Sequence, residues 1–166
     1  MRMIIIGILV IFNLILESTL FQYMRIGGVK PDFVIVFVVA YAILRGKNYS
    51  TFIGLFSGIL VDLMYGQVIG VNALAYMLTG FLIGQFHESV FKDSYFPAIL
   101  FNITAVLVYQ HIFLLISYFT KVDIIYTNAL LNVIIPQCVY NALIGGVLYR
   151  YFFRLDNKNF MDKRLY

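Results

Sequence analysis

Long apolar stretches alternate with short polar ones along this chain, which predicts a set of helices joined by short loops. Six stretches are predicted to be helical: 3–24, 33–44, 50–65, 71–86, 95–119 and 124–152. The second and third are short for a bilayer span, which needs about 20 mostly apolar residues. Their ends should therefore border a thinned region or be shielded by other helices. Pro136 falls in the middle of the last stretch, where it should kink the helix.

The third stretch has the sharpest pattern of all. Gly54, Gly58, Asp62 and Gly66 recur every four residues, so they form one stripe on a helix. Glycine costs about 1 kcal/mol relative to alanine in a helix interior in water. In a bilayer, however, small residues allow a second helix to approach closely. We therefore expect this helix to be the element around which the rest of the bundle packs.

The fourth stretch repeats the spacing of four, with Asn72, Tyr76, Gly80 and Gly84 on one face. Two helices with glycine-lined faces are expected to cross at close range. The faces could instead dock a transmembrane helix of another protein. Packing within the chain is the favoured interpretation.

Composition places this pattern in a membrane. The chain has 166 residues, of which 62% are hydrophobic and 12% charged, and its mean hydropathy is +0.90. Soluble domains carry about 25% charged residues. We predict one transmembrane domain over 1–153 and a basic cytoplasmic tail over 154–166. The N-terminal apolar run is interpreted as a retained anchor rather than a cleaved signal peptide, and the single Cys138 excludes an intrachain disulfide and a cysteine-based zinc site.

The distribution of basic residues predicts the orientation. Six spans would place both termini on one side, together with Arg2, Arg45, Lys47, Lys92, Arg150, Arg154, Lys158, Lys163 and Arg164. Only Arg25, Lys30 and Lys121 would lie on the other side. Because cytoplasmic loops carry the excess of Lys and Arg, both termini are expected in the cytoplasm. The net charge of +4 fits basic loops at an inner membrane, and no basic patch interleaved with aromatic residues points to nucleic acid.

With this orientation, polar residues gather in the outward half of the bundle. They are Glu17, Asp32, Asp62, Asn72, His111, Asn128 and Asn132. A carboxylate at the bilayer centre costs about 2.5–3.5 kcal/mol on insertion scales, so each acid needs a partner or a purpose. For Asp62 a buried hydrogen bond, or an ion pair with Arg25 or Lys30, is favoured over ligand recognition. For Glu17 both interpretations remain open.

Other polar positions have structural interpretations. Pro31 and Asp32 open the second stretch, where Pro suits a first helical turn and Asp can cap it. His111 is expected to be a buried, satisfied bundle histidine, because no second His or Cys lies at metal spacing. Asn132 is a candidate buried polar residue of the same kind. No metal or cofactor is predicted.

The sequence gives no support for catalysis. No nucleophile elbow, zinc-protease motif or phosphate-binding loop is present. Ser57, His111, Asp32 and Asp62 could still meet in three dimensions, but nothing in their spacing assigns them catalytic roles. No catalytic residue is therefore predicted.

Several of these residues together resemble a known family. Pro31-Asp32 opens an apolar helix, Gly46 follows, then Gly54-x-x-x-Gly58-x-x-x-Asp62, then Gly70 and a helix bearing Gly80. This order resembles the rod shape-determining protein MreD family over about residues 28–86.

The resemblance implies a bacterial inner-membrane protein of the cell-elongation machinery that acts without catalysis. It implies as partners the single-span protein MreC, the actin-like MreB filament, and the glycosyltransferase and transpeptidase that build the lateral wall. In size and helix number the chain is also similar to the substrate-binding subunits of energy-coupling-factor transporters. We therefore expect a scaffold for a single-span partner; the alternative is a small-molecule binding subunit of a transporter with an outward pocket formed by Asp62, Glu17, His111 and the asparagines.

Overall fold

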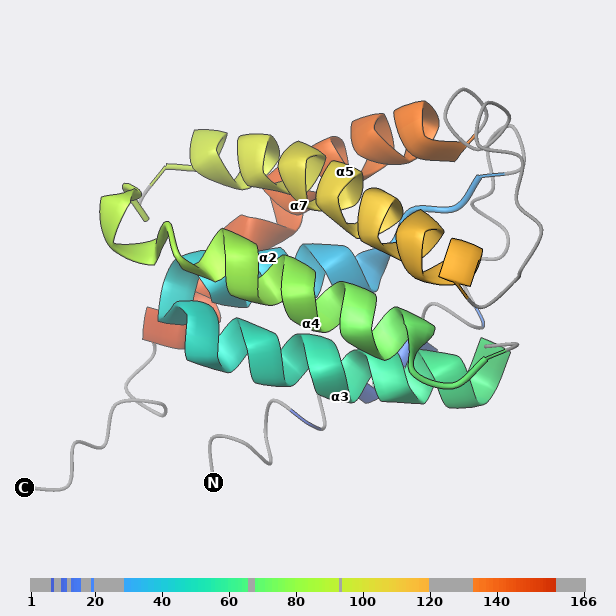
Figure 1. Cartoon of the computed structure of the whole chain (residues 1–166). Helices are drawn as coiled ribbons and strands as arrows, with labels where there is room; N and C mark the ends of the chain where they lie inside the picture. The colour runs from blue at the N-terminus through green and yellow to red at the C-terminus, as the bar shows by residue number, and fades with distance from the viewer. Residues whose placement is uncertain are drawn as a thin grey trace, which may run out of the picture.

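The computed structural model describes residues 29–65, 68–92, 94–119 and 133–157, together with positions 7, 10–11, 13–15 and 19; for 155–157 it describes the backbone only. The elements are α2 (Phe33–Arg45), α3 (Lys47–Tyr65), α4 (Val71–Gly84), the 3-10 helix η1 (His87–Ser89), α5 (Phe96–Phe119) and α7 (Ile135–Asn157). They pack into one bundle (Figure 1). The predicted all-α class is confirmed.

Most helix bounds agree with the sequence pattern, and the last helix differs from it. The α-helix α7 begins at Ile135, so Pro136 lies in the first turn of this element, directly after the π-helical residues 133 and 134. The predicted start of this helix, over 124–132, lies outside the described residues. At its other end α7 continues to Asn157.

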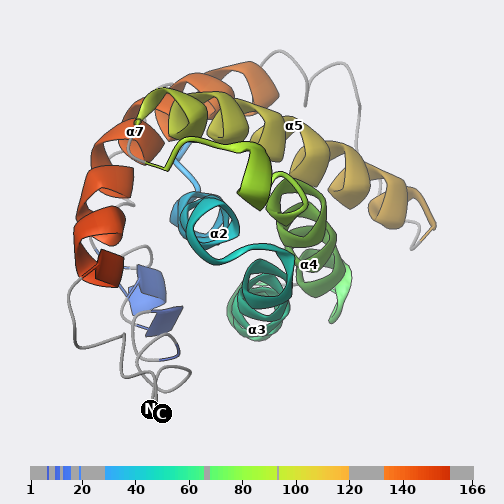
Figure 2. The same cartoon turned by 90° about the vertical axis from the view of Figure 1, so that its left-hand side faces the viewer.

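The central element of the bundle is α2. Every residue from Phe33 to Leu44 is buried, and α3, α4, α5 and α7 all pack against this helix (Figure 2). A helix that is hydrophobic on all sides is stable only when it is surrounded. The expectation that the glycine-striped helix forms the centre is therefore wrong: α3 exposes Phe52 and Leu63 and lies on the outside.

The glycine faces of α3 and α4 meet each other. A Cβ at Gly54 would lie 2.7 Å from the carbonyl carbon of Tyr76, and one at Gly58 would lie 2.7 Å from the amide nitrogen of Ala73. Farther along the pair, a Cβ at Gly80 or Gly84 would lie 2.6 Å from a backbone atom of α3. The two antiparallel backbones therefore touch along the whole length of the pair. We call this unit the α3–α4 pair.

The outer faces of the bundle are apolar. Among the described residues, α5 is the one helix that is both long and apolar enough to cross a membrane, and α2 and α4 are apolar but shorter. Large apolar side chains of α3, α4, α5 and α7 are exposed, among them Leu63, Leu74, Leu115 and Val147.

The two ends of the bundle differ in charge. We name them the Asp32 end, where α2 and α4 begin, and the His87 end, where both finish. The basic residues at the His87 end are Arg45, Lys47, Lys92, Arg150 and Arg154. Among the described residues the Asp32 end carries one basic residue, Lys30.

Candidate functional site

Asp62 lies one step beyond the glycines of α3 and binds the beginning of α4. Its carboxylate accepts hydrogen bonds from the backbone N–H of Gly70 (2.9 Å), Asn72 (3.1 Å) and Ala73 (3.0 Å) and from the side-chain amide of Asn72 (2.8 Å). The first N–H groups of a helix have no partner within it, and the helix dipole favours an anion there. A residue of α3 therefore caps α4, and hydrogen bonds satisfy this buried carboxylate.

Gly70 allows the backbone to adopt the conformation that this cap requires. Its φ is +106°, in the left-handed region where a side chain would be strained. A Cβ at this position would contact nothing within 4 Å, so the requirement for glycine comes from the backbone and not from space.

Asp32 forms the second polar centre. Its carboxylate caps α2 by accepting the N–H of Ile35 (3.0 Å) and also accepts the hydroxyl of Tyr76 (2.7 Å). Its backbone pairs reciprocally with Asn141 of α7: the Asp32 N–H donates to Oδ1 (2.9 Å), and Nδ2 donates to the Asp32 carbonyl (3.2 Å). Asp32 thus links α2, α4 and α7. The adjacent Pro31 is buried and precedes the helix cap, so the prediction that it lies in the first helical turn is wrong.

Two tyrosines connect the two acidic centres. Tyr76 of α4 and Tyr109 of α5 stack with ring centroids 4.4 Å apart and an interplanar angle of 17°. The Tyr109 hydroxyl donates to the side-chain oxygen of Asn72, which itself binds Asp62. Beside them, Gln110 of α5 donates to Gln137 of α7. Hydrogen bonds and ring contacts therefore join α2, α3, α4, α5 and α7 at the Asp32 end.

This network borders a cavity of about 480 Å³, which we call the Asp32-end cavity. The lining residues are Val29, Lys30, Asp32, Val61, Tyr65, Asn72, Tyr76, Tyr109, Gln110, Phe113, Val133 and Gln137. The ammonium of Lys30 lies 5.3 Å from the ring centroid of Tyr65, in a cation–π contact. The lining of this cavity therefore provides one cation, one carboxylate, carboxamides and phenol hydroxyls, together with apolar side chains.

Several of the predicted site residues lie elsewhere. His111 is exposed rather than buried, and its Nδ1 lies 2.7 Å from the carbonyl oxygen of Leu107 in its own helix. Neither His111 nor Asp62 lines the Asp32-end cavity, in contrast to the outward pocket expected from the sequence. Glu17 and Asn132 lie outside the described residues.

The glycines that resemble the family motif have interior positions. Gly54, Gly58, Gly80 and Gly84 all face the partner helix within the α3–α4 pair. A single side-chain carbon at any of them would collide with backbone. The chain itself fills the space beside these positions.

Neither a catalytic group nor a metal site emerges from the described part of the chain. Within it, no cluster of three or more His, Cys, Asp or Glu side chains could hold a metal ion. The buried hydroxyl of Ser57 has no hydrogen-bond partner among the described residues, so no base activates it there.

Some site residues were not identified from the sequence. Tyr109 carries no distinguishing signal among 13 tyrosines. Tyr76 shared the four-residue spacing of its helix, but only the fold shows that its hydroxyl reaches Asp32. Lys30 was considered only as a counter-ion.

These features define an all-helical bundle with apolar outer faces, a central helix that is apolar and buried from Phe33 to Leu44, and a polar network at one end. Comparison with protein families then identifies its class. The model of the family described as rod shape-determining protein MreD matches residues 1–159, so the chain belongs to this family of bacterial membrane proteins that determine rod shape. Neither the curated proteins nor the solved structures contain a match to the chain.

Proposed function

We propose that this protein is a non-catalytic scaffold of the cell-wall elongation machinery that holds a single-span, MreC-like partner in the membrane. Family membership supports the part in rod-shape determination. The observation that carries the binding role is the Asp32-end cavity, whose walls are fixed by hydrogen bonds between helices. A preformed cavity with a few convergent polar groups is the usual form of a binding site.

The partner is proposed to bind at the rim of this cavity and not on the glycine faces. Those faces are filled by the α3–α4 pair itself. Lys30 and Tyr65 stand at the rim, and Tyr65 is 48% exposed. The positive charge of Lys30 and the carboxamides of Gln110 and Gln137 suit an acidic or hydrogen-bonding segment close to the partner's membrane span.

We also propose an orientation of the protein in the membrane. A chain with six spans and both termini in the cytoplasm would direct the Asp32 end outward, and the basic residues at the His87 end support this direction. The likeness to the substrate-binding subunits of energy-coupling-factor transporters is proposed for the fold only. The MreB filament, the glycosyltransferase and the transpeptidase are further partners that the family resemblance suggests.

Site-specific photocrosslinking in growing cells tests the binding role. A crosslinking amino acid at position 65 should capture a single-span membrane protein. The matched control is position 52, because Phe52 is similarly exposed (53%) on the same helix and does not line the cavity. Equal capture from both positions, or capture from position 52 alone, would refute binding at the cavity.

A small molecule is the second candidate occupant. The favouring observation is the volume of about 480 Å³, which lies within the range of about 300–1,000 Å³ typical of ligand pockets. Native mass spectrometry of the purified full chain decides between them. A stoichiometric small molecule that is lost in Lys30→Gln would favour the transporter-type function, and a chain without such a ligand would favour the scaffold.

A further inference from the structure

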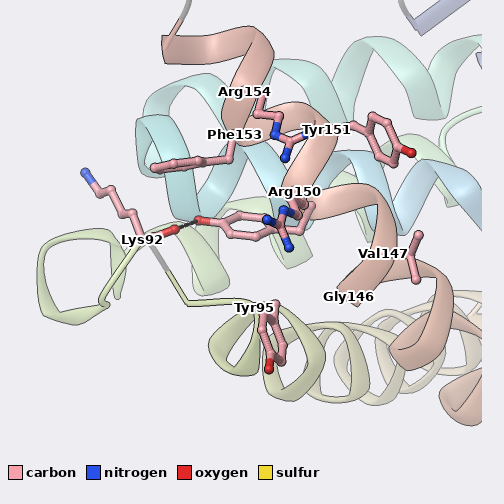
Figure 3. A pocket seen from close by; sticks show the side chains of 9 residues that line it. Lys92, Tyr95, Gly146, Val147, Arg150, Tyr151, Phe153 and Arg154 are labelled. Atoms are coloured by element: carbon pink, nitrogen blue, oxygen red, sulfur yellow. Dashed lines mark hydrogen bonds between the residues drawn. The ribbon is translucent and has the colours of Figure 1, made fainter.

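A second cavity, of about 710 Å³, lies at the His87 end between the turn before α5 and the last turns of α7. It is lined by three basic side chains, four aromatic ones and the small apolar surface of Gly146 and Val147 (Figure 3). None of its lining residues in the described part of the chain is acidic. We call it the basic groove.

Two arginines supply the strongest positive charge of the basic groove. Arg150 and Arg154 are four residues apart on α7, so they share a face of the helix. Figure 3 shows both guanidinium groups over the same stretch of this helix. Both side chains are exposed, and no ion pair joins either of them to another residue in the described part of the chain. Like charges at this spacing repel, and an anion held between them would remove the repulsion.

The opposite wall of the groove is fixed in place. The Tyr149 hydroxyl of α7 donates to the backbone carbonyl of Lys92 (2.9 Å). The Lys92 ammonium lies 3.1 Å from Nε2 of His87, whose Nδ1 lies 2.7 Å from the carbonyl oxygen of Ile43 in α2. Lys92 is therefore anchored to the bundle, and Figure 3 shows its ammonium turned away from the two arginines, which are the exposed cations of the groove.

An apolar stripe leads from the arginines toward the middle of α7. Val139, Leu143, Val147 and Tyr151 follow at intervals of four, and each is between 53% and 65% exposed. Their spacing places them on one face of the helix. A headgroup at the arginines would therefore continue directly into an apolar track about as long as an acyl chain, at about 1.5 Å per residue.

We propose that the basic groove binds the phosphate headgroup of an anionic membrane phospholipid. Arg150 and Arg154 are the phosphate ligands, because the planar guanidinium fork matches phosphate oxygens. The stripe from Val139 to Tyr151 lies along the acyl chain. A soluble phosphate would use the arginines alone, whereas the continuous apolar track favours a lipid. Basic pockets between membrane helices on the cytoplasmic side commonly bind such headgroups.

Native mass spectrometry of the purified full chain in detergent tests this site with two added lipids, phosphatidylglycerol and phosphatidylcholine. The wild type should retain phosphatidylglycerol in preference. Arg150→Gln and Arg154→Gln should each weaken its binding about five-fold, the effect of one basic residue near a charged surface. Lys47→Gln is the matched control, since it removes one charge from the same end but outside the groove, and it should leave binding unchanged.

A second variant covers the case in which an arginine variant fails to fold. Val147→Trp keeps every charge and fills the apolar floor, so it should also displace phosphatidylglycerol. The proposal is overturned if phosphatidylcholine binds equally well, if Lys47→Gln weakens binding as much as Arg150→Gln, or if Val147→Trp has no effect. It is also overturned if inorganic phosphate displaces phosphatidylglycerol and binds with the same affinity, because the groove would then recognise a free anion and not a lipid.

Discussion

At the scale of single residues, the buried acids of this protein are stabilised by hydrogen-bond donors at the beginnings of helices, and the charge of Lys30 adds to this for Asp32. Asp62 accepts three backbone N–H groups and one amide at the beginning of α4. Asp32 accepts one backbone N–H and a phenol at the beginning of α2. Such hydrogen bonds reduce the free-energy cost of burying a carboxylate in a bundle.

Replacing Asp62 by Asn should destabilise the protein. The change removes one of two acceptor oxygens and points an amide donor at other donors, at a cost of about 1–3 kcal/mol. Thermal unfolding in detergent can be followed by the reaction of a thiol dye with the half-buried Cys138. Leu63→Asn is the control, because Leu63 is next in sequence and 65% exposed; equal effects of the two changes would contradict the cap.

Tyr76→Phe should be destabilising by a similar mechanism. The variant keeps the ring stack with Tyr109 and leaves one oxygen of Asp32 without its donor, which costs about 1–3 kcal/mol. The same thermal assay applies, with the exposed Tyr95→Phe as control. In an Asp32→Asn background the effect of Tyr76→Phe should become smaller, because the two residues share one interaction. Additive effects would show that the hydroxyl is not important for Asp32.

Residue types predicted these roles only in part. Asp32 next to Pro31 is recognisable as a helix cap, because the signal lies within four residues of sequence. The partners of Asp62 depend on how the turn after α3 folds back, so a hydrogen bond and an ion pair with Arg25 or Lys30 could not be distinguished. The exposure of His111 depends on which face of α5 meets α2, and the weak periodicity of that helix gives no indication of it.

At the scale of elements, the α3–α4 pair is the tightest contact of the fold. Its register is fixed at four glycines and ends at Asp62, so each turn of one helix lies against a defined turn of the other. Close backbone contact of this kind is what small residues provide in membrane helices.

Gly58→Ala should therefore destabilise the protein although alanine favours helices. Its Cβ would lie 2.7 Å from the amide nitrogen of Ala73, and overpacking of this kind costs about 1–3 kcal/mol. Gly7→Ala is the matched control, because Gly7 is also helical and a Cβ there meets nothing within 4 Å. The melting temperature of Gly58→Ala should be lower than that of Gly7→Ala. A higher melting temperature for Gly58→Ala would contradict the close contact.

The positions of helices could be predicted from the sequence better than their arrangement. Apolar runs and the breakers Gly46 and Gly70 mark the limits of α2, α3 and α4 within a few residues. The choice of α3 as the central helix was wrong because a glycine stripe marks a close contact, which is not the same as burial on all sides. The relevant signal is that the run from Phe33 to Leu44 contains no charged residue and also no Asn, Gln, Ser, Thr or His, in contrast to α4 and α5.

At the scale of the whole molecule, the two ends of the bundle have different chemistry. One end combines the hydrogen-bonded Asp32 and Asp62 with a polar cavity, and the other carries five of the six described Lys and Arg residues, three of which line the basic groove. This asymmetry is the basis for the proposed orientation in the membrane.

Thiol labelling tests the orientation. In a Cys138→Ser background, a cysteine at the exposed position 68, at the Asp32 end, should react with a membrane-impermeant reagent added to spheroplasts. A cysteine at the exposed position 48, at the His87 end, should react only after the membrane is opened. The reverse pattern would invert the proposed topology.

Depletion in a rod-forming host tests the role of the whole protein. Cells should round up, because a scaffold of wall elongation is needed to keep the rod shape. Wild-type protein should restore rods, and so should Arg150→Gln if lipid binding is an auxiliary property. Unchanged cell shape after depletion would contradict the proposed part in wall elongation.

The fixed register of the α3–α4 pair limits how this molecule can change shape. Sliding by one helical turn would drive side chains into backbone and remove Asp62 from the start of α4, so the pair can only move as a rigid body. Rearrangement must then occur by shear across α2, between this body and the neighbouring α5 and α7. Tyr76 lies on one of these sides and Gln137 on the other, so such a displacement would have to break the hydrogen bonds that fix the cavity walls, while the glycine contacts would stay intact.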